Sequence, residues 1–228
     1  MTVLSADAHR ETRVLTARHA DLGDAQMACL IVPDEFRRVA TEYPILFRPN
    51  AARDRVDAYA LLGFEAGENL FLQADGWDAR YVPMAMDVAP LQIGQGPAGA
   101  QVHLDTAHPR IATGGDGVRL FDDLGRPSPW LEAAMARLAA FDAGYAAMPA
   151  LVAAWRRYDL LEPTTLEVTL RDGSTNRLVG YHAVNEAKVE ALDAAALGEL
   201  HAAGHLLPLF MAIAALGNVG KLVARRDG

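Results

Sequence analysis

A histidine and an aspartate two residues apart form the most chemically suggestive pattern in the chain. His103 and Asp105 have the His-x-Asp spacing that begins the two-histidine, one-carboxylate ligand set of non-heme iron oxygenases. Alternate residues of a strand point to one face, so a strand could present both side chains to one metal ion. The distal ligand could come from His182, His201 or His205. Two-oxoglutarate-dependent enzymes also need a basic residue soon after that histidine, and the sequence lacks it. A three-residue pattern of this kind is more typical of solvated polar groups at a strand end.

The other candidate motifs favour structure over chemistry. His201 and His205 have the spacing of two metal ligands on one helix, but Gly204 between them is predicted to end that helix. The run Gly114–Gly117 lacks the Lys and Ser or Thr of a phosphate-binding loop, so it is interpreted as a turn. Cys29 lies in an apolar run and is interpreted as a buried hydrophobic residue. We therefore expect no catalytic residue, metal or cofactor.

Hydrophobic runs separated by turn residues predict short antiparallel strands in the first half of the chain. They are expected near residues 13–17, 28–32, 45–47, 58–64, 70–72, 77–82, 102–105 and 118–121. A short helix should begin at Pro33, and a loop should cover 94–99. Residues 1–24 are polar and are expected to be loosely ordered, whereas 25–228 should form a single domain.

Helical spacing dominates the rest of the chain, apart from one hairpin. Ser128 before Pro129 predicts a helix start, and the spacing continues to about Tyr158, with breaks expected at Gly144 and Pro149. A β-hairpin is expected over 166–184, followed by helices over 186–203 and 205–223. In the last helix, Leu206 and Ile213 are predicted to be buried. These elements indicate an α+β fold in which an antiparallel sheet system packs against helices from the middle and C-terminal regions.

Composition excludes several classes of protein. The 228 residues are 51% hydrophobic and 22% charged, with a net charge of −8, which is ordinary for a soluble globular protein but unfavourable for nucleic-acid binding. The first residues lack the basic and apolar regions of a secretion signal. The longest apolar run, about 206–216, is shorter than the roughly 20 residues of a membrane span. We expect a soluble, cytoplasmic protein without a transmembrane segment.

The order of several short motifs resembles the SapC family, the group named for S-layer-associated SapC. The matching blocks are Val32–Phe36, Glu42–Phe47, Leu61–Phe64, Gly67–Phe71, Asp75–Trp77, Tyr81–Pro83, Leu120–Asp122, Gly125, Pro127–Ser128, Asp172–Gly173, Leu178–Tyr181, Val184–Val189 and Leu216–Asn218. Together they span about residues 25–223. Two segments depart from the family pattern. Residues 84–89 stand where members usually carry a basic-Tyr-Pro-Phe-like segment, and 210–214 stand where members carry a Tyr-Ala-His-like element.

The resemblance implies a context more than an activity. The family name implies a cell-envelope or S-layer association. Members of the family also look like neighbours of halogenase-like proteins and outer-membrane receptors, which is an association and not an activity. We therefore expect a soluble, non-catalytic accessory or binding protein with a protein partner. The alternative is a metal-dependent oxygenase that uses His103 and Asp105. The ligand and the oligomeric state are left open by the sequence.

Polar residues inside otherwise apolar family blocks are the candidates for a binding surface. A few polar groups in a mostly apolar pocket are typical of ligand sites. The candidates are Glu35, Glu68, Asn69, Tyr81 and Asn218. In the alternative interpretation, the asparagines cap turns and helix ends, and Tyr81 buries its ring with its hydroxyl group paired.

Overall fold

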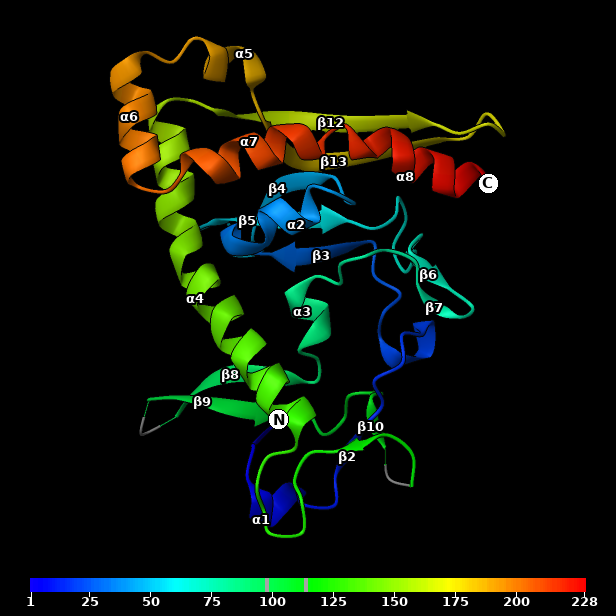
Figure 1. Ribbon diagram of the computed structural model, residues 1–228. Helices are drawn as coiled ribbons and strands as arrows, with labels where there is room; N and C mark the ends of the chain where they lie inside the picture. The colour runs from blue at the N-terminus through cyan, green and yellow to red at the C-terminus, as the bar shows by residue number, and fades with distance from the viewer. Residues whose placement is uncertain (97–98, 113–114) are drawn as a thin grey trace. The chain divides into compact units, whose positions relative to one another are not determined.

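The computed structural model describes residues 1–96, 99–112 and 115–228. Within these ranges the fold is α+β, with antiparallel sheets and helices, as the sequence predicts (Figure 1). The chain divides into two compact units. Unit 1 comprises Met1–Ala25, Phe71–Asp78 and Met84–Ala143, and unit 2 comprises Gln26–Leu70, Ala79–Pro83 and Gly144–Gly228. The expected single domain stays a prediction.

Unit 1 is built from short strands and short helices. Its elements are β1 (Thr2–Val3), α1 (Ala6–His9), β2 (Arg13–Val14), the 3₁₀ helix η1 (Ala20–Leu22), β6 (Leu72–Gln73), β7 (Gly76–Trp77), α3 (Met84–Asp87), β8 (Leu91–Gly96), β9 (Gly99–Leu104), β10 (Ile111–Ala112) and β11 (Val118–Arg119). The strands pair in the orders β1-β9-β8, β10-β2-β11 and β6-β7. The core contains Leu91, Leu104, Leu120, Phe121 and Leu131. The first residues of the chain thus take part in two of these sheets.

A buried ion pair ties the segment after β2 into unit 1. Arg110 and Asp24 are each only 2% exposed, and Arg110 Nη2 lies 2.6 Å from both carboxylate oxygens of Asp24. The other guanidinium nitrogen donates to the carbonyls of Leu15, at 2.9 Å, and Ala17, at 2.7 Å. Because these hydrogen bonds satisfy both charges, the pair can stay buried.

Unit 2 contains the largest sheet, of order β12-β13-β4-β5-β3. Its elements are β3 (Ala28–Ile31), the 3₁₀ helix η2 (Pro33–Glu35), α2 (Phe36–Val39), β4 (Ile45–Pro49), β5 (Val56–Leu61), β12 (Leu161–Thr169), β13 (Thr175–Val184), α5 (Glu186–Glu190), α6 (Ala194–Ala202), α7 (Leu206–Ala215) and α8 (Asn218–Asp227). The predicted hairpin is therefore joined to the earlier strands, through the pairing of β13 with β4. The strands of unit 1 form separate sheets, so a single sheet system is not what the structure shows.

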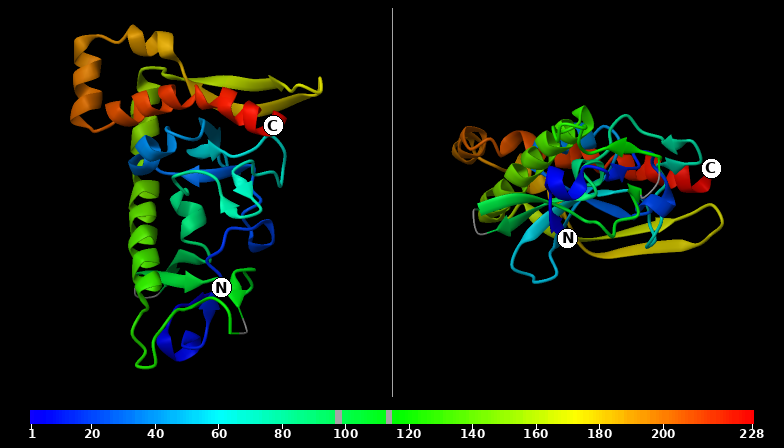
Figure 2. Two further views of the ribbon diagram at one scale, coloured as in Figure 1. Left: turned by 45° about the vertical axis from the view of Figure 1, so that its right-hand side comes forward. Right: turned by 90° about the horizontal axis from the view of Figure 1, so that it is seen from below.

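One face of this sheet carries the core of unit 2. Phe47 on β4 is fully buried and meets the rings of Phe36 and Trp155 edge to face, with centroids 6.1 and 5.5 Å away. Trp155 Nε1 donates to the carbonyl of His205 at the start of α7. Helices α7 and α8 run alongside the β12–β13 hairpin (Figures 1 and 2). The core thus fastens α2, α4 and α7 to the sheet.

The middle helix α4 (Pro129–Arg157) is continuous, which corrects the predicted breaks at Gly144 and Pro149. Its first half belongs to unit 1 and its second half to unit 2. A Cβ atom on Gly144 would lie 2.7 Å from the Cβ of Val32, so glycine serves close packing here and does not end the helix. Pro149 costs one helical hydrogen bond, but its neighbours Met148 and Leu151 are buried, and that packing outweighs the local cost.

Other boundaries also differ from the predictions. The expected loop over 94–99 is mostly strand, because 91–96 pairs with 99–104. Of the expected strand over 77–82, only Trp77 lies in a strand, the two-residue β7. The expected helix over 186–203 is two helices, and the expected helix over 205–223 is α7 and α8. Residues 97–98 and 113–114, which fall in the predicted loop and turn, lie outside the described residues.

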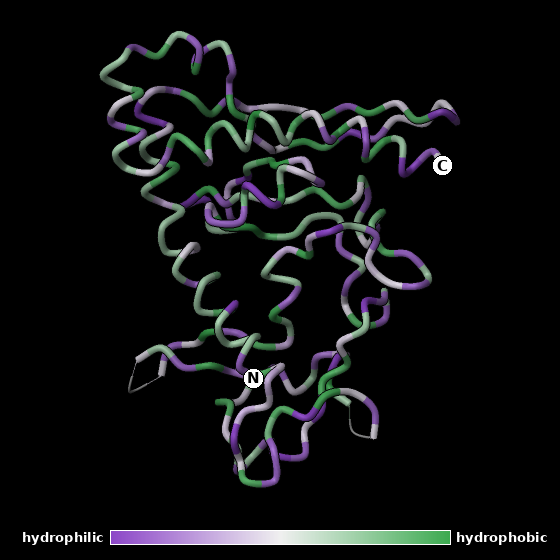
Figure 3. Tube along the Cα trace, viewed as in Figure 1, coloured by the Kyte–Doolittle hydropathy of each residue, from purple (hydrophilic) through white to green (hydrophobic). Residues whose placement is uncertain are grey.

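The buried face of α7 is not the one predicted. Leu209, Ala212 and Ala215 are buried, whereas Leu206 and Ile213 are half-buried. Figure 3 shows α7 as a mainly hydrophobic trace and the end of α8 as hydrophilic. Among the described residues, Pro129–Arg157 and Leu206–Asp227 are long and apolar enough to cross a membrane by length and composition. Core helices meet the same criteria, so the expected absence of a transmembrane segment stays a prediction.

Candidate functional site

Three of the five candidate residues belong to one buried polar cluster in unit 2, formed by Glu35, Tyr43, Tyr81 and Asn218. Glu35 is fully buried, and its two oxygens accept hydrogen bonds from the Val32 amide at 3.0 Å and the Tyr81 hydroxyl at 2.7 Å. Tyr43 donates to the Tyr81 carbonyl. Asn218 Nδ2 donates to the carbonyls of Ala40 at 2.8 Å and Tyr43 at 3.2 Å. These bonds hold the start of α8 and the 79–83 segment against the region around α2.

The other two candidates lie between β5 and β6. Glu68 accepts a hydrogen bond from the Phe64 amide at 2.7 Å and pairs with Arg226 Nε at 3.1 Å. A Cβ atom on Gly63 would come within 2.8 Å of the Glu68 carbonyl, so this turn requires glycine. Asn69 is half-buried in the same segment. Glu68 therefore has structural bonds of its own, and the binding role of all five residues stays a prediction.

His103 lies near the end of β9, and Asp105 directly follows this strand. His103 pairs with Gln92 and Val3 in the sheet, and its Nε2 is buried without a hydrogen-bond partner among the described residues. Asp105 accepts a hydrogen bond from the Ala107 amide at 3.1 Å. Within the described ranges, no group of three or more His, Cys, Asp or Glu side chains could hold a metal ion. The iron-site alternative thus has no assembled ligand set in the part of the chain that is described.

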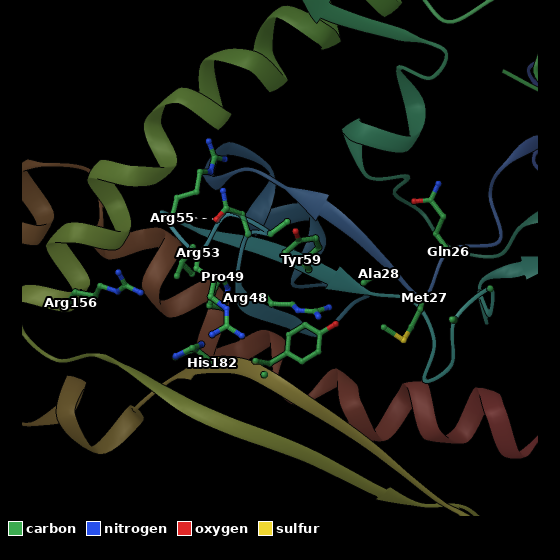
Figure 4. A pocket seen from close by; sticks show the side chains of 17 residues that line it. Gln26, Met27, Ala28, Arg48, Pro49, Arg53, Arg55, Tyr59, Arg156 and His182 are labelled. Atoms are coloured by element: carbon green, nitrogen blue, oxygen red, sulfur yellow. Dashed lines mark hydrogen bonds between the residues drawn. The ribbon is translucent and has the colours of Figure 1, made fainter. Parts of the chain in front are cut away.

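Unit 2 contains a positively charged cleft of about 1000 Å³ that crosses the sheet (Figure 4). Its lining comprises Gln26, Met27, Ala28, Arg48, Pro49, Asn50, Ala51, Arg53, Arg55, Val56, Tyr59, Ala66, Gly67, Arg156, Gly180, Tyr181 and His182. We call it the arginine cleft. No Asp or Glu and none of the five sequence-based candidates is among these residues.

Strand register explains why the arginine cleft is polar on the face away from Phe47. In β4 and β5, Arg48 pairs with Asp57, and Leu46 pairs with Tyr59. Side chains alternate along a strand, so Arg48 and Tyr59 point away from the face that carries Phe47. His182 pairs with Phe47 across β13 and β4, so its side chain lies on the Phe47 side of β13, where it borders the cleft near Arg156. Figure 4 shows Arg156 extending from α4 toward the strands.

The arginines of the cleft are not equivalent. Arg55 already has partners within the protein. Its Nε lies 2.7 Å from the Asp57 carboxylate, and its guanidinium carbon lies 3.5 Å from the centre of the Tyr145 ring. Arg48 lies over the Tyr181 ring at 5.5 Å. In the part of the chain that is described, Arg48, Arg53 and Arg156 form no ion pair with a carboxylate. Within the described ranges, the cleft thus holds three guanidinium groups that have no ion-pairing carboxylate.

The pKa values of two rings in the cleft, His182 and Tyr59, are shifted in the direction that favours the neutral form. Burial, together with the positive charge of Arg156, lowers the pKa of His182. The Nδ1 atom of His182 is buried without a hydrogen-bond partner among the described residues. Burial, with Asp57 nearby, raises the pKa of Tyr59. The charge of the cleft is thus carried by its arginines alone.

Sequence reasoning missed this cleft, although one signal was present. Arg48, Arg53 and Arg55 fall within eight residues of an acidic chain. Arg156 and His182 come from distant segments, and His182 was considered only as an iron ligand.

A family model described as SapC matches residues 4–222. The chain belongs to the SapC family. No curated protein and no solved structure matches it. The blocks that suggested SapC in the sequence map mainly onto the turns and the buried polar cluster of unit 2. Gly67, Gly180 and Tyr181 of these blocks line the arginine cleft, whereas its arginines lie outside the blocks.

Proposed function

We propose that this SapC-family protein is a non-catalytic binding protein and that the arginine cleft is its binding site for a multiply charged anion. The observation that carries the proposal is the set of three guanidinium groups without a counter-ion, Arg48, Arg53 and Arg156. Like charges gathered in one cleft repel one another, and a bound anion relieves that repulsion. Guanidinium groups match the geometry of phosphate and carboxylate oxygens.

The charge balance favours a phosphate-like ligand over a single carboxylate. One carboxylate would neutralise one of the three free guanidinium groups, whereas a phosphate ester carries close to two negative charges at neutral pH. Since the chain as a whole has a net charge of −8, the cleft is a local exception and not part of a general basic surface.

The wider role in this proposal follows from the family. As a SapC-like accessory protein, the chain would serve a system of the cell envelope or the S-layer, or one encoded in a gene cluster with a halogenase and a receptor. A protein partner and a cytoplasmic location are parts of the same proposal. Recovery of the protein from its own cells with its bound molecules would test these parts directly.

Calorimetric titration with inorganic pyrophosphate at low ionic strength tests the site. We expect binding to the unaltered protein and a loss of roughly tenfold or more in affinity for Arg48→Gln and for Arg156→Gln. Arg177→Gln is the matched control, because Arg177 is an exposed arginine on β13 outside the cleft. The proposal is wrong if pyrophosphate does not bind, or if all three variants weaken binding equally.

A further inference from the structure

The arginine cleft is too large for a phosphate group alone. Its volume of about 1000 Å³ lies at the upper end of the roughly 300–1000 Å³ of clefts that hold organic ligands. The lining comes from β13, β4, β5 and the start of β3, which are neighbours in the sheet in that order. Neighbouring strands lie about 4.8 Å apart, so the cleft extends roughly 14 Å across them. A ligand that fills it is elongated.

The two ends of the cleft differ in chemistry. Arg156 and His182 lie at the β13 end, and Figure 4 shows Gln26 and Met27 at the opposite end. The lining of that far end is uncharged and includes Ala28 and Gly67. An elongated ligand would thus place its anionic group at the β13 end and an uncharged part toward β3.

Planar groups occupy the middle of the cleft. Tyr59 on β5 is half-buried, and its raised pKa keeps the phenol neutral. On the adjacent strand, the guanidinium carbon of Arg48 lies over the Tyr181 ring, 5.5 Å from its centre. Aromatic rings prefer to stack on, or meet edge to face with, such planar groups, whereas flexible alkyl chains gain only contact area from them.

We infer that the ligand of the arginine cleft is a phosphate ester of an aromatic ring. This inference rests on the proposed function and narrows it to a ligand class. The phosphate group binds among Arg53, Arg156 and His182, and the ring lies against Tyr59 and Arg48. The uncharged end near Met27 accommodates whatever substituent the ring carries.

Three probes of graded structure test the inference: inorganic phosphate, phenyl phosphate and n-hexyl phosphate, titrated by calorimetry under one buffer condition. We expect phenyl phosphate to bind roughly fivefold or more tightly than n-hexyl phosphate. Equal affinities of the two esters would overturn the aromatic class in favour of an alkyl phosphate such as a lipid headgroup. Equal affinities of phenyl phosphate and inorganic phosphate would also overturn it, because no part of the cleft would then recognise the ring.

Substitutions at Tyr59 locate the ring. Tyr59→Leu should remove the preference for phenyl phosphate over n-hexyl phosphate, and Tyr59→Phe should retain it. A preference that survives Tyr59→Leu would contradict the placement. If Tyr59→Leu does not fold, the comparison of esters on the unaltered protein still decides the ligand class. If inorganic phosphate binds and Arg156→Gln abolishes this binding, but phenyl phosphate binds no more tightly than n-hexyl phosphate, this inference alone is refuted. If none of the three probes binds, the proposed function is refuted as well.

Discussion

Glu35 is a fully buried carboxyl group whose oxygens both accept hydrogen bonds within unit 2. Because both oxygens are used in hydrogen bonds within the protein, the main role of Glu35 is to stabilise the fold. The same holds for Asn218, which joins α8 to two carbonyl groups near α2. At the scale of single residues, these buried polar positions therefore differ from Arg48, Arg53 and Arg156, which are exposed and form no ion pair among the described residues.

Removal of the Glu35 carboxyl group should destabilise the protein. Glu35→Ala leaves the Tyr81 hydroxyl and the Val32 amide without their acceptor, so we expect a loss of about 2–4 kcal/mol in the free energy of unfolding, measured with urea. Tyr81→Phe, which removes one of these bonds, should cost about 1 kcal/mol. If Glu35→Ala keeps its stability and loses ligand binding instead, Glu35 is a binding residue, as the sequence suggested.

His182 should make anion binding depend on pH. Its pKa is lowered by burial and by Arg156, so the ring is neutral at pH 7 and gains a proton only as the pH falls below the ordinary value of about 6.5. The added charge beside Arg156 should strengthen the binding of sulfate, whose own charge is constant over this range. Calorimetry at stepped pH should show this rise, and His182→Gln should abolish it.

The control for this experiment is His201→Gln, because His201 is exposed on α6 and outside the cleft. Protonation also has a cost in stability. The unfolded chain takes up the proton at a higher pH than the folded chain does, so His182 lowers the free energy of unfolding as the pH falls through its unfolded pKa. A pH profile of sulfate binding that is identical in both variants would contradict the role of His182.

Among the elements, α7 shows how little the hydrophobicity of a helix says about its buried face. Its sequence is apolar almost throughout, yet Leu209 is fully buried, whereas Leu207 and Phe210 are 56% and 45% exposed. The contacts with α2, β4 and β13 select the buried face. The same principle explains α4, where Gly144 and Pro149 remain inside a continuous helix because the packing around them outweighs their local preferences.

Leu209→Asp should unfold the protein or lower its free energy of unfolding by more than about 3 kcal/mol, since it places a charge in the core and removes a buried leucine. Leu207→Asp on the same helix should change stability by less than about 1 kcal/mol. Thermal melts of the two variants measure the difference. Similar melting temperatures would mean that the buried face of α7 has been assigned wrongly.

For the molecule as a whole, α4 is the element that both units share. Its first half packs in the core around Leu131 and Leu138, and its second half carries Trp155 into the core of unit 2. A continuous helix transmits the loss of packing at one end along its hydrogen-bond ladder. The two units should therefore unfold together.

Tryptophan fluorescence can follow each unit separately during thermal unfolding. A variant with Trp77→Phe and Trp155→Phe reports on Trp130 in unit 1, and a variant with Trp77→Phe and Trp130→Phe reports on Trp155 in unit 2. For each variant, we expect the midpoint of the fluorescence transition to equal the midpoint measured by circular dichroism on the same variant. Separate transitions, or stable proteolytic fragments cut near residues 125 or 160, would show two independent domains.

Local features of the sequence determine much of this protein. Alternating and turn residues were sufficient to predict the hairpin that became β12 and β13, Ser128 and Pro129 marked the start of α4, and the ordered blocks identified the SapC family. These features act over a few residues, through backbone preferences and the period of hydrophobic side chains, so they can be recognised without the fold.

The tertiary structure alone decided the candidate site. Arg48, Arg156 and His182 are far apart in the sequence, and only the pairing of β13 with β4 and the packing of α4 bring them to one cleft. The same long-range contacts placed Glu35 and Asn218 in a buried polar cluster and kept α4 whole. No local preference encodes which distant segments become neighbours, because that choice depends on the total packing of the chain.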